Sequence, residues 1–231
     1  GRLASIDKVI EEVKLKTGHM YGDLCDKRIV ITAGGTREPL DPVRFLSNRS
    51  SGKMGFALAE AARNRGAHVT LISSVKRSNL AGVEFIATET TEQMFNEVKR
   101  TTKQADALIM AAAVSDFKFK EVKKDKIKDK NKDMSVNLVP NPDIIASIDK
   151  NIIKVAFAAE TKDLKKYAEK KLSSKNAHFI VANDVSDSSI GFNSDNNKVT
   201  IISDTGKVVN LPIMPKIEVS HAILNSLKEY F

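Results

Sequence analysis

Residues 31–55 read ITAGGTREPLDPVRFLSNRSSGKMG, and this stretch decides the fold. An apolar strand over Arg28–Ala33 leads into the glycine pair at positions 34 and 35, and a long polar loop follows. The loop closes on SSGK, residues 50–53, which opens an amphipathic helix. Backbone N–H groups at a helix start, approached through glycines, form a natural phosphate site. The stretch therefore predicts an anion site beyond the first strand.

Strand and helix patterns alternate along the chain after this stretch. Small and apolar residues favour a helix over 52–65, and Gly66 is suited to end it. Repeated strand–helix units predict an α/β fold, a Rossmann-like doubly wound parallel sheet covered on both faces. We expect strands over residues 28–33, 68–73, 83–87, 105–113, 152–159 and 177–182, and helices over 52–65, 91–101, 141–149, 163–173 and 215–230.

Two segments do not fit a parallel core. Residues 134–139 and 198–211 show apolar–polar alternation or hairpin-turn residues, which is typical of antiparallel strands. We expect a small antiparallel appendage that acts as a dimerisation flap. A short helix over residues 5–16, ended by a glycine, precedes the first strand, so residues 1–27 are interpreted as a lead-in and residues 28–231 as the main domain.

Composition excludes several classes of protein. No run of the 231 residues is long and apolar enough to span a bilayer, and no secretory signal pattern is present. The single cysteine, Cys25, excludes an internal disulfide and fits a reducing compartment, so we expect a cytoplasmic protein with no membrane partner. The net charge of +8 favours polyanionic partners, which include nucleic acid and phosphorylated small molecules.

Much of the basic charge is concentrated in residues 118–132, where acidic residues interrupt the lysines. Tryptophan is absent and no aromatic platform recurs, so the sequence gives little support to a base-stacking surface, and we expect no nucleic-acid partner. A nucleic-acid-binding module that uses this stretch is kept as an alternative. The histidines at positions 19, 68, 178 and 221 are scattered, so no metal cluster is predicted.

The ends of several expected strands carry polar side chains. Loops with such residues follow the strands over 28–33, 105–113, 152–159 and 177–182. In an open parallel sheet, ligands bind beyond the carboxyl ends of the strands. Because all four loops open on one edge, they predict a binding site there.

Familiar nucleotide-binding motifs are incomplete in this chain. Residues 50–54, SSGKM, match the end of a P-loop, but the earlier glycine is missing and Met54 replaces the Ser or Thr that binds Mg²⁺. The GxGxxG pattern is absent after the first strand. Tyr167 and Lys171 have the Tyr-x-x-x-Lys spacing of short-chain dehydrogenases, so a nicotinamide-dependent oxidoreductase is kept as a second alternative.

Eight motifs occur in an order that resembles one family. They are ITAGGTREPLDPVR (31–44), SNRSSGKMG (47–55), AAAVSD (111–116), KIK (126–128), NPDI (141–144), FAAET (157–161), ANDVS (182–186) and GFNSDN (191–196). Together they resemble the bacterial, CTP-dependent phosphopantothenoylcysteine synthetase, a phosphopantothenate–cysteine ligase. That family forms the synthetase domain of a bifunctional coenzyme A biosynthesis flavoprotein. The chain departs from the family pattern at Pro140, usually Lys, and at Ala156, usually Gly.

The resemblance implies a reaction. 4′-Phosphopantothenate, CTP and L-cysteine give phosphopantothenoylcysteine, CMP and pyrophosphate through an acyl-cytidylate, with Mg²⁺ as the cofactor. A homodimer is expected, and so is a native fusion to a flavin-dependent decarboxylase domain upstream of residues 1–27. No FMN is expected in this chain, because the flavin belongs to that other domain. The implied partners are therefore small molecules.

The resemblance also implies roles for individual residues. Asn48 and Lys126 correspond to catalytic residues, and Asn48 and Ala113 to substrate-binding ones. The metal ligands are unknown. The residues implied to bind the nucleotide are Gly34, Ser50, Gly52, Met110, Ala111, Ala112, Asp116, Lys126, Pro142, Asp143, Ile144, Ile145, Phe157, Lys171 and Lys175.

Overall fold

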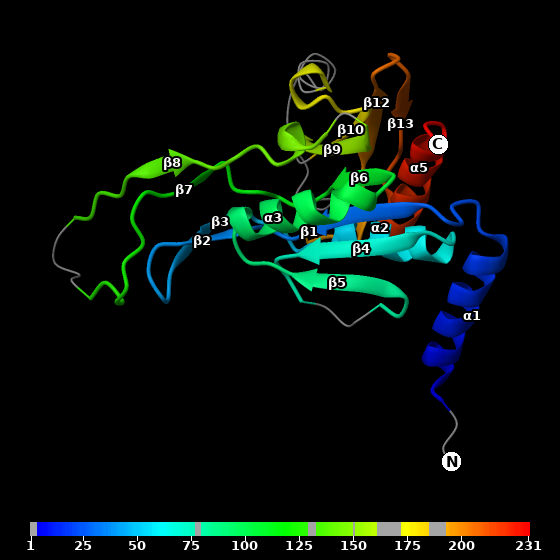
Figure 1. Ribbon diagram of the computed structural model, residues 1–231, viewed down its shortest axis with the longest axis horizontal. Helices are drawn as coiled ribbons and strands as arrows, with labels where there is room; N and C mark the ends of the chain where they lie inside the picture. The colour runs from blue at the N-terminus through cyan, green and yellow to red at the C-terminus, as the bar shows by residue number, and fades with distance from the viewer. Residues whose placement is uncertain (1–3, 77–79, 129–132, 150, 161–171, 185–192) are drawn as a thin grey trace.

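An eight-stranded sheet forms the centre of the described part of the molecule (Figure 1). The structure is a computed structural model and describes residues 4–76, 80–128, 133–149, 151–160, 172–184 and 193–231. Six neighbouring strands of this sheet run parallel, and the last two, β12 and β13, add an antiparallel edge. In spatial order they are β5 (Val83–Ala87), β4 (His68–Ser73), β1 (Arg28–Ala33), β6 (Ala107–Met110), β9 (Ile153–Glu160), β10 (Phe179–Asp184), β12 (Val199–Ser203) and β13 (Val208–Asn210).

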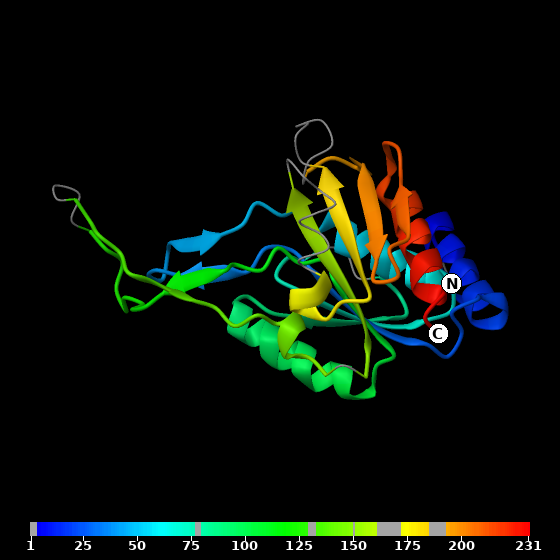
Figure 2. The same ribbon diagram turned by 90° about the horizontal axis from the view of Figure 1, so that it is seen from above.

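Helices cover both faces of the sheet, as the alternating pattern predicts (Figure 2). On one face lie α2 (Lys53–Asn64) and α5 (Lys216–Lys228), and on the other lies α3 (Thr91–Thr101). The sheet has a hydrophobic core on each face. β1 contributes to both, because Ile29 faces the first core and Val30 faces the second. The doubly wound α/β fold is confirmed. In the described ranges, no helix has the length and apolar character that a membrane span requires.

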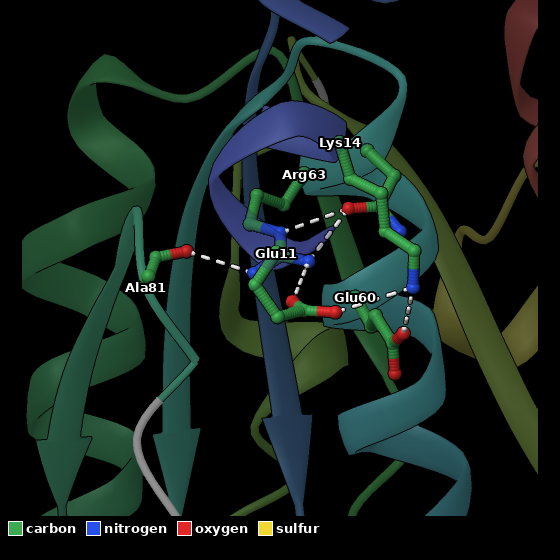
Figure 3. A network of polar contacts seen from close by, with 6 residues as sticks. Glu11, Lys14, Glu60, Arg63 and Ala81 are labelled. Carbon is green, nitrogen blue, oxygen red and sulfur yellow. Dashed lines mark hydrogen bonds and ion pairs between the residues drawn. The ribbon is translucent and has the colours of Figure 1, made fainter. Parts of the chain in front are cut away.

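The N-terminal helix is longer than the sequence predicts. α1 spans Ile6–Tyr21 and continues through Gly18. A Cβ on this buried glycine would lie 2.6 Å from a carbonyl oxygen of α2, so the glycine permits close contact between the helices. The fully buried Arg63 of α2 fixes the contact by donating to Glu11 Oε2 at 2.5 Å and to the Ala81 carbonyl at 3.0 Å (Figure 3).

Two antiparallel ribbons project from one side of the sheet (Figures 1 and 2). One pairs β2 (Arg37–Pro39) with β3 (Phe45–Ser47), and the other pairs β7 (Phe117–Phe119) with β8 (Leu138–Pro140). We call the described residues of 117–140 the arm. The antiparallel strand expected over 134–139 is therefore shorter, since only its last residues pair with β7.

The other segment expected in the appendage, residues 198–211, belongs instead to the main sheet. β12 pairs with β10 and places the side chain of Ile201 in the core beside Val181. The expectation was wrong because an antiparallel strand can extend a parallel sheet at its edge. A separate short pair, β11 (Asn196–Asn197) with β14 (Met214–Pro215), lies at the start of α5.

The helix expected over residues 141–149 is also wrong. Only the short 3-10 helix η2 (Ile145–Ser147) forms there, and a second one, η1 (Thr102–Gln104), follows α3. The Asp143 side chain accepts the Ala146 N–H at 3.2 Å, and Ile148 is already extended, so no further turn continues. The strand expected over 105–113 shortens to β6. Most of the helix expected over 163–173 lies outside the described residues, although residues 172–175 are helical.

Candidate functional site

A cavity of about 670 Å³ opens at the carboxyl edge of the parallel strands. Loops or strand ends from β1, β6, β9 and β10 contribute to it, so the convergence predicted from the sequence is observed for these strands. The lining consists of residues 48–55, 110–116, 141–145 and 156–158, together with Lys175, Asn183, Asn197 and Lys216.

Most residues that the resemblance singles out lie on this cavity. Two described residues do not: Gly34 lies behind its wall and Lys126 lies on the arm. Lys171 falls outside the described residues. Those that line the cavity are Asn48, Ser50, Gly52, Met110, Ala111, Ala112, Ala113, Asp116, Pro142, Asp143, Ile144, Ile145, Phe157 and Lys175.

The start of α2 forms one wall. Gly52 precedes the helix with φ of 74°, a conformation that a side chain disfavours, and a Cβ there would lie 2.6 Å from a Val75 side-chain carbon. Gly34 packs directly behind it, 3.3 Å from that Cβ position. The first residues of α2 line the cavity, and the N–H groups of a first helical turn favour anions. This wall can hold a phosphate.

Asn48 lies at the lip of the cavity and joins two of its loops. Its Nδ2 donates to the Val114 carbonyl at 2.9 Å, which ties the segment between β3 and α2 to the loop after β6. Gly35 permits this approach, since a Cβ there would lie 2.5 Å from the Asn48 carbonyl oxygen. The side chain is thereby oriented beside the small residues of the next wall.

The loop after β6 presents backbone to the cavity. Its residues 111–113 are alanines, so a ligand can approach the peptide groups closely. The loop is fixed from behind, because the Ala112 N–H donates to Thr32 Oγ1 at 3.1 Å and the Ser115 N–H donates to Thr36 Oγ1 at 2.9 Å. Asp116 follows at the exposed end. Such a rigid backbone wall suits a flat or extended ligand.

An ion pair closes the opposite wall. Lys175 Nζ lies 2.5 Å from Asp143 Oδ2, and both side chains are partly exposed to the cavity mouth. The adjoining Asn141 donates from Nδ2 to the Ser115 carbonyl at 2.9 Å, while its buried Oδ1 has no partner among the described residues. A ligand that brings a donor or a phosphate finds complementary groups here.

Two lysines on the cavity received no role from the sequence. Lys53 Nζ donates to Asp195 Oδ1 at 2.6 Å and to the Asn193 carbonyl at 2.7 Å. Lys216 Nζ donates to the Ser194 carbonyl, and both lysines line the cavity. Together they bind the 193–196 loop across the start of α2. The GFNSDN motif marks this loop in the sequence, but nothing in the sequence places the loop beside Lys53.

A buried asparagine, Asn197, and a half-buried one, Asn183, line the cavity next to this loop. Asn197 Nδ2 donates to Asn183 Oδ1 at 3.1 Å, and both residues line the cavity. Asn197 is 4% exposed, so the amide pair is held rigidly. The ANDVS motif at 182–186 contains Asn183, whereas the GFNSDN motif ends one residue before Asn197.

Lys126 lies on the arm and does not line the cavity of its own chain. The arm is gripped next to it: the Arg44 guanidinium donates to the Ile127 carbonyl at 2.5 Å, and Asp41 Oδ2 accepts the Ile127 N–H at 3.2 Å. Burial raises the pKa of Asp41, but the N–H donors of Val43, Ile127 and Arg44 and the Arg44 charge outweigh burial and lower it. The Asp41 carboxylate that holds the arm, a contact we call the Asp41 grip, is therefore charged at neutral pH.

Comparison with known proteins identifies the family of the chain. Residues 24–230 match the family described as "DNA/pantothenate metabolism flavoprotein C-terminal domain". The chain belongs to this family. It is 43% identical to the coenzyme A biosynthesis bifunctional protein CoaBC of Bacillus subtilis, over 98% of this chain and 57% of that protein. Identity to CoaBC of Vibrio parahaemolyticus is also 43%, over 88% of this chain and 52% of that protein.

Solved structures show the same fold. The crystal structure of the C-terminal domain of CoaBC has a TM-score of 0.76 at 37% identity and covers 89% of this chain and 96% of that chain. A Cab2 variant, solved as a complex with phosphopantothenate-cysteine, has a TM-score of 0.71 at 20% identity and covers 100% of this chain and 95% of that chain. The family member described here spans about half the length of its CoaBC relatives.

Proposed function

We propose that this chain is a phosphopantothenate–cysteine ligase that converts CTP to CMP and pyrophosphate. The observation that carries the proposal is the meeting of separate motifs, residues 48–55, 110–116 and 141–145, around one cavity. Membership of the family supports it, since its CoaBC relatives are named for coenzyme A biosynthesis. A carboxylate does not acylate an amine because its leaving group is oxide. A cavity that aligns the carboxylate with a nucleoside triphosphate lets it form a mixed anhydride, whose nucleoside monophosphate is a better leaving group.

In the first half-reaction, the carboxylate oxygen of phosphopantothenate attacks the α-phosphorus of CTP. A P–O bond forms, the bond to the β-phosphate oxygen breaks, and pyrophosphate leaves. Asn48 orients the carboxylate through its neutral amide, without the strong ion pair that a lysine would form. The start of α2 and Lys175 offset phosphate charge as it shifts to the leaving group.

In the second half-reaction, the cysteine amine attacks the acyl carbonyl of the cytidylate. The C–N bond forms, the C–O bond to CMP breaks, and the amine releases a proton. Lys126 assists by neutralising charge on the departing phosphate, which requires its loop to reach a cavity. The cytosine ring of the nucleotide lies against residues 142–145, and Phe157 packs on it. All of these residues line the cavity.

The proposed Mg²⁺ would come with the nucleotide. Within the described ranges, no group of three or more His, Cys, Asp or Glu side chains could hold a metal ion. Triphosphate oxygens and water are ordinary Mg²⁺ ligands, so the protein need supply few. Magnesium would neutralise triphosphate charge, and the chain's own lysines would orient the phosphates.

The quaternary arrangement is proposed on similar grounds. The arm and its neighbouring ribbon expose large apolar side chains, among them Phe45, Phe117 and Leu138, which are 51%, 49% and 44% exposed. Such a surface suits contact with a second copy of the chain. The length of the relatives supports a native fusion to a further domain, which we propose to be the flavin-dependent decarboxylase upstream of residues 1–27, in a cytoplasmic enzyme.

The test is product analysis. Phosphopantothenate and cysteine are supplied with either CTP or ATP and Mg²⁺, and pyrophosphate, CMP and AMP are measured with the amide product. Equal amounts of pyrophosphate, CMP and product with CTP support the proposal. Tight NADPH binding without any pyrophosphate would favour the oxidoreductase alternative, and salt-dependent RNA binding without pyrophosphate would favour the nucleic-acid module.

A further inference from the structure

β9, a central strand, carries a buried lysine. Its sequence is IKVAFAAE, and Lys154 is 0% exposed among the apolar residues of the second core. Burying an ammonium group is costly, and an apolar residue at the same place often stabilises a fold at least as well. Lys154 therefore calls for an explanation beyond core packing.

The Lys154 ammonium group reaches the end of η2. Nζ donates to the Ile148 carbonyl at 3.1 Å and to the Ile145 carbonyl at 3.5 Å. The Ile145 carbonyl also accepts the Ile148 N–H at 3.4 Å within the turn, whereas the Ile148 carbonyl follows the turn, where a lysine can satisfy it. The side chain thus fixes the C-terminal end of η2 from inside the core.

The same segment forms a wall of the cavity. Pro142, Asp143, Ile144 and Ile145 line it, and Asn141 fixes the beginning of the segment through the Ser115 carbonyl. The segment is therefore held at both ends, by Asn141 at the entry and by a buried cation at the exit. A displacement of either end would move the backbone groups that face a bound ligand.

We propose that Lys154 is a positioning residue that holds η2 against the base of a bound nucleotide. The inference rests on the proposed function, in which residues 142–145 contact the base. Lys154 itself is fully buried and does not line the cavity. A charge-assisted hydrogen bond to a carbonyl is short-ranged and directional, so it can set the position of one turn without altering the distant walls.

The experiment compares Lys154→Met and Lys154→Gln with the unaltered chain. K154M keeps the length of the side chain and removes every donor, whereas K154Q keeps one N–H donor on a shorter side chain. Binding of CTP and of ATP with Mg²⁺ is measured by calorimetry without the other substrates. Lys103→Met, an exposed lysine in η1, is the matched control.

We expect the Kd for the bound nucleotide to rise about tenfold in K154M and about threefold in K154Q, as loss of a hydrogen bond to a charged group implies. K103M leaves it unchanged, and the KM for cysteine stays within about twofold in all variants. An unchanged nucleotide Kd in either folded Lys154 variant would overturn the inference. A parallel rise of the KM values for CTP, phosphopantothenate and cysteine would also overturn it, and so would failure of both variants to fold. In either case Lys154 would serve the fold as a whole.

The proposed function fails separately. If the unaltered chain binds CTP but releases no pyrophosphate with phosphopantothenate and cysteine, the ligase assignment is wrong. The Kd series still decides the role of Lys154 in that case, because it needs no turnover.

Discussion

Asp41 Oδ2 accepts the backbone N–H of Ile127 at 3.2 Å, although the two residues are 86 positions apart in the chain. Asp41 belongs to the loop between β2 and β3, and Ile127 lies on the arm between Lys126 and Lys128. The contact fixes the backbone next to the lysine to which we assign the second half-reaction. It links the most distinctive motif of the sequence to the arm.

Asp41→Asn should slow turnover without weakening nucleotide binding. The amide would present an N–H₂ group or a weaker acceptor to Ile127 and Arg44, so the arm would lose its anchor. We expect kcat to fall about tenfold with the CTP Kd unchanged. The measurement is pyrophosphate release beside calorimetry, with the exposed Asp125→Asn as control. A D41N enzyme with normal kcat would separate the grip from catalysis.

The Asp41 grip should also depend on pH in a defined direction. Because the pKa of Asp41 is lowered in the folded chain, its contribution is complete above the usual value of 3.8 and disappears as pH falls through the lowered value. Hydrogen exchange at Ile127, compared between the unaltered chain and D41N at each pH, reports it. The ratio of the exchange rate at Ile127 in D41N to that in the unaltered chain should be constant from about pH 7 to about pH 5. It should approach one only in stronger acid. Loss of the ratio near neutral pH would contradict this.

Asn48→Asp should stop the first half-reaction. It places a second anion beside the substrate carboxylate and removes the N–H₂ group that joins Asn48 to Val114. We expect pyrophosphate release to fall about a hundredfold or more, as for loss of a positioned donor at a reacting oxyanion. Asn151→Asp, at an exposed position before β9, is the control. Normal release by N48D would refute the role of Asn48.

Lys126→Gln should reduce kcat more than it weakens binding. The side chain is exposed and lines no cavity of its own chain, so it contributes little to ground-state contacts. We expect kcat to fall about tenfold or more while the CTP Kd changes less than about twofold. Single-turnover kinetics should place the loss in the cysteine-dependent step. An unaffected rate, or a loss confined to binding, would show that Lys126 has another task.

Arg63→Met should destabilise the fold without affecting the site. It removes the buried guanidinium that contacts Glu11, whose side chain is 33% exposed, and it leaves the Ala81 carbonyl without its donor. Because Glu11 still reaches water, we expect the loss of the Arg63 hydrogen bonds to lower the free energy of unfolding by about 1–3 kcal/mol. The exposed Lys14 contacts Glu11 at 3.2 Å, and Lys14→Met should lower the free energy of unfolding by less than about 1 kcal/mol. Urea titration measures both, and an equal effect would contradict the importance of burial.

The parallel core was predictable because its signals are local. Apolar strands such as Arg28–Ala33 and the glycines at 34 and 52 dictate their own conformation. The helix expected over 141–149 failed because a tertiary contact, Lys154 on the Ile148 carbonyl, fixes the end of a single short turn. The prediction for β12 and β13 was wrong because β12 pairs with β10, a contact between distant parts of the chain that alternation cannot specify, and β13 follows β12.

The cavity was predictable where motif and strand end coincide, as at Asn48 and residues 110–116. It was not predictable at Lys53, Lys216 and Asn197, whose partners lie in distant segments. A lysine next to a glycine-rich helix start reads as a phosphate ligand or as a surface residue equally well. Only the folded chain shows that Lys53 holds the 193–196 loop.

The most direct test of the central claim is a single turnover with CTP labelled at the α-phosphate, phosphopantothenate and Mg²⁺, without cysteine. The account predicts release of about one pyrophosphate per chain and retention of the label as a bound acyl-cytidylate. Addition of cysteine then frees CMP together with the amide. Absence of pyrophosphate until cysteine is present would contradict a cavity that activates the acid first.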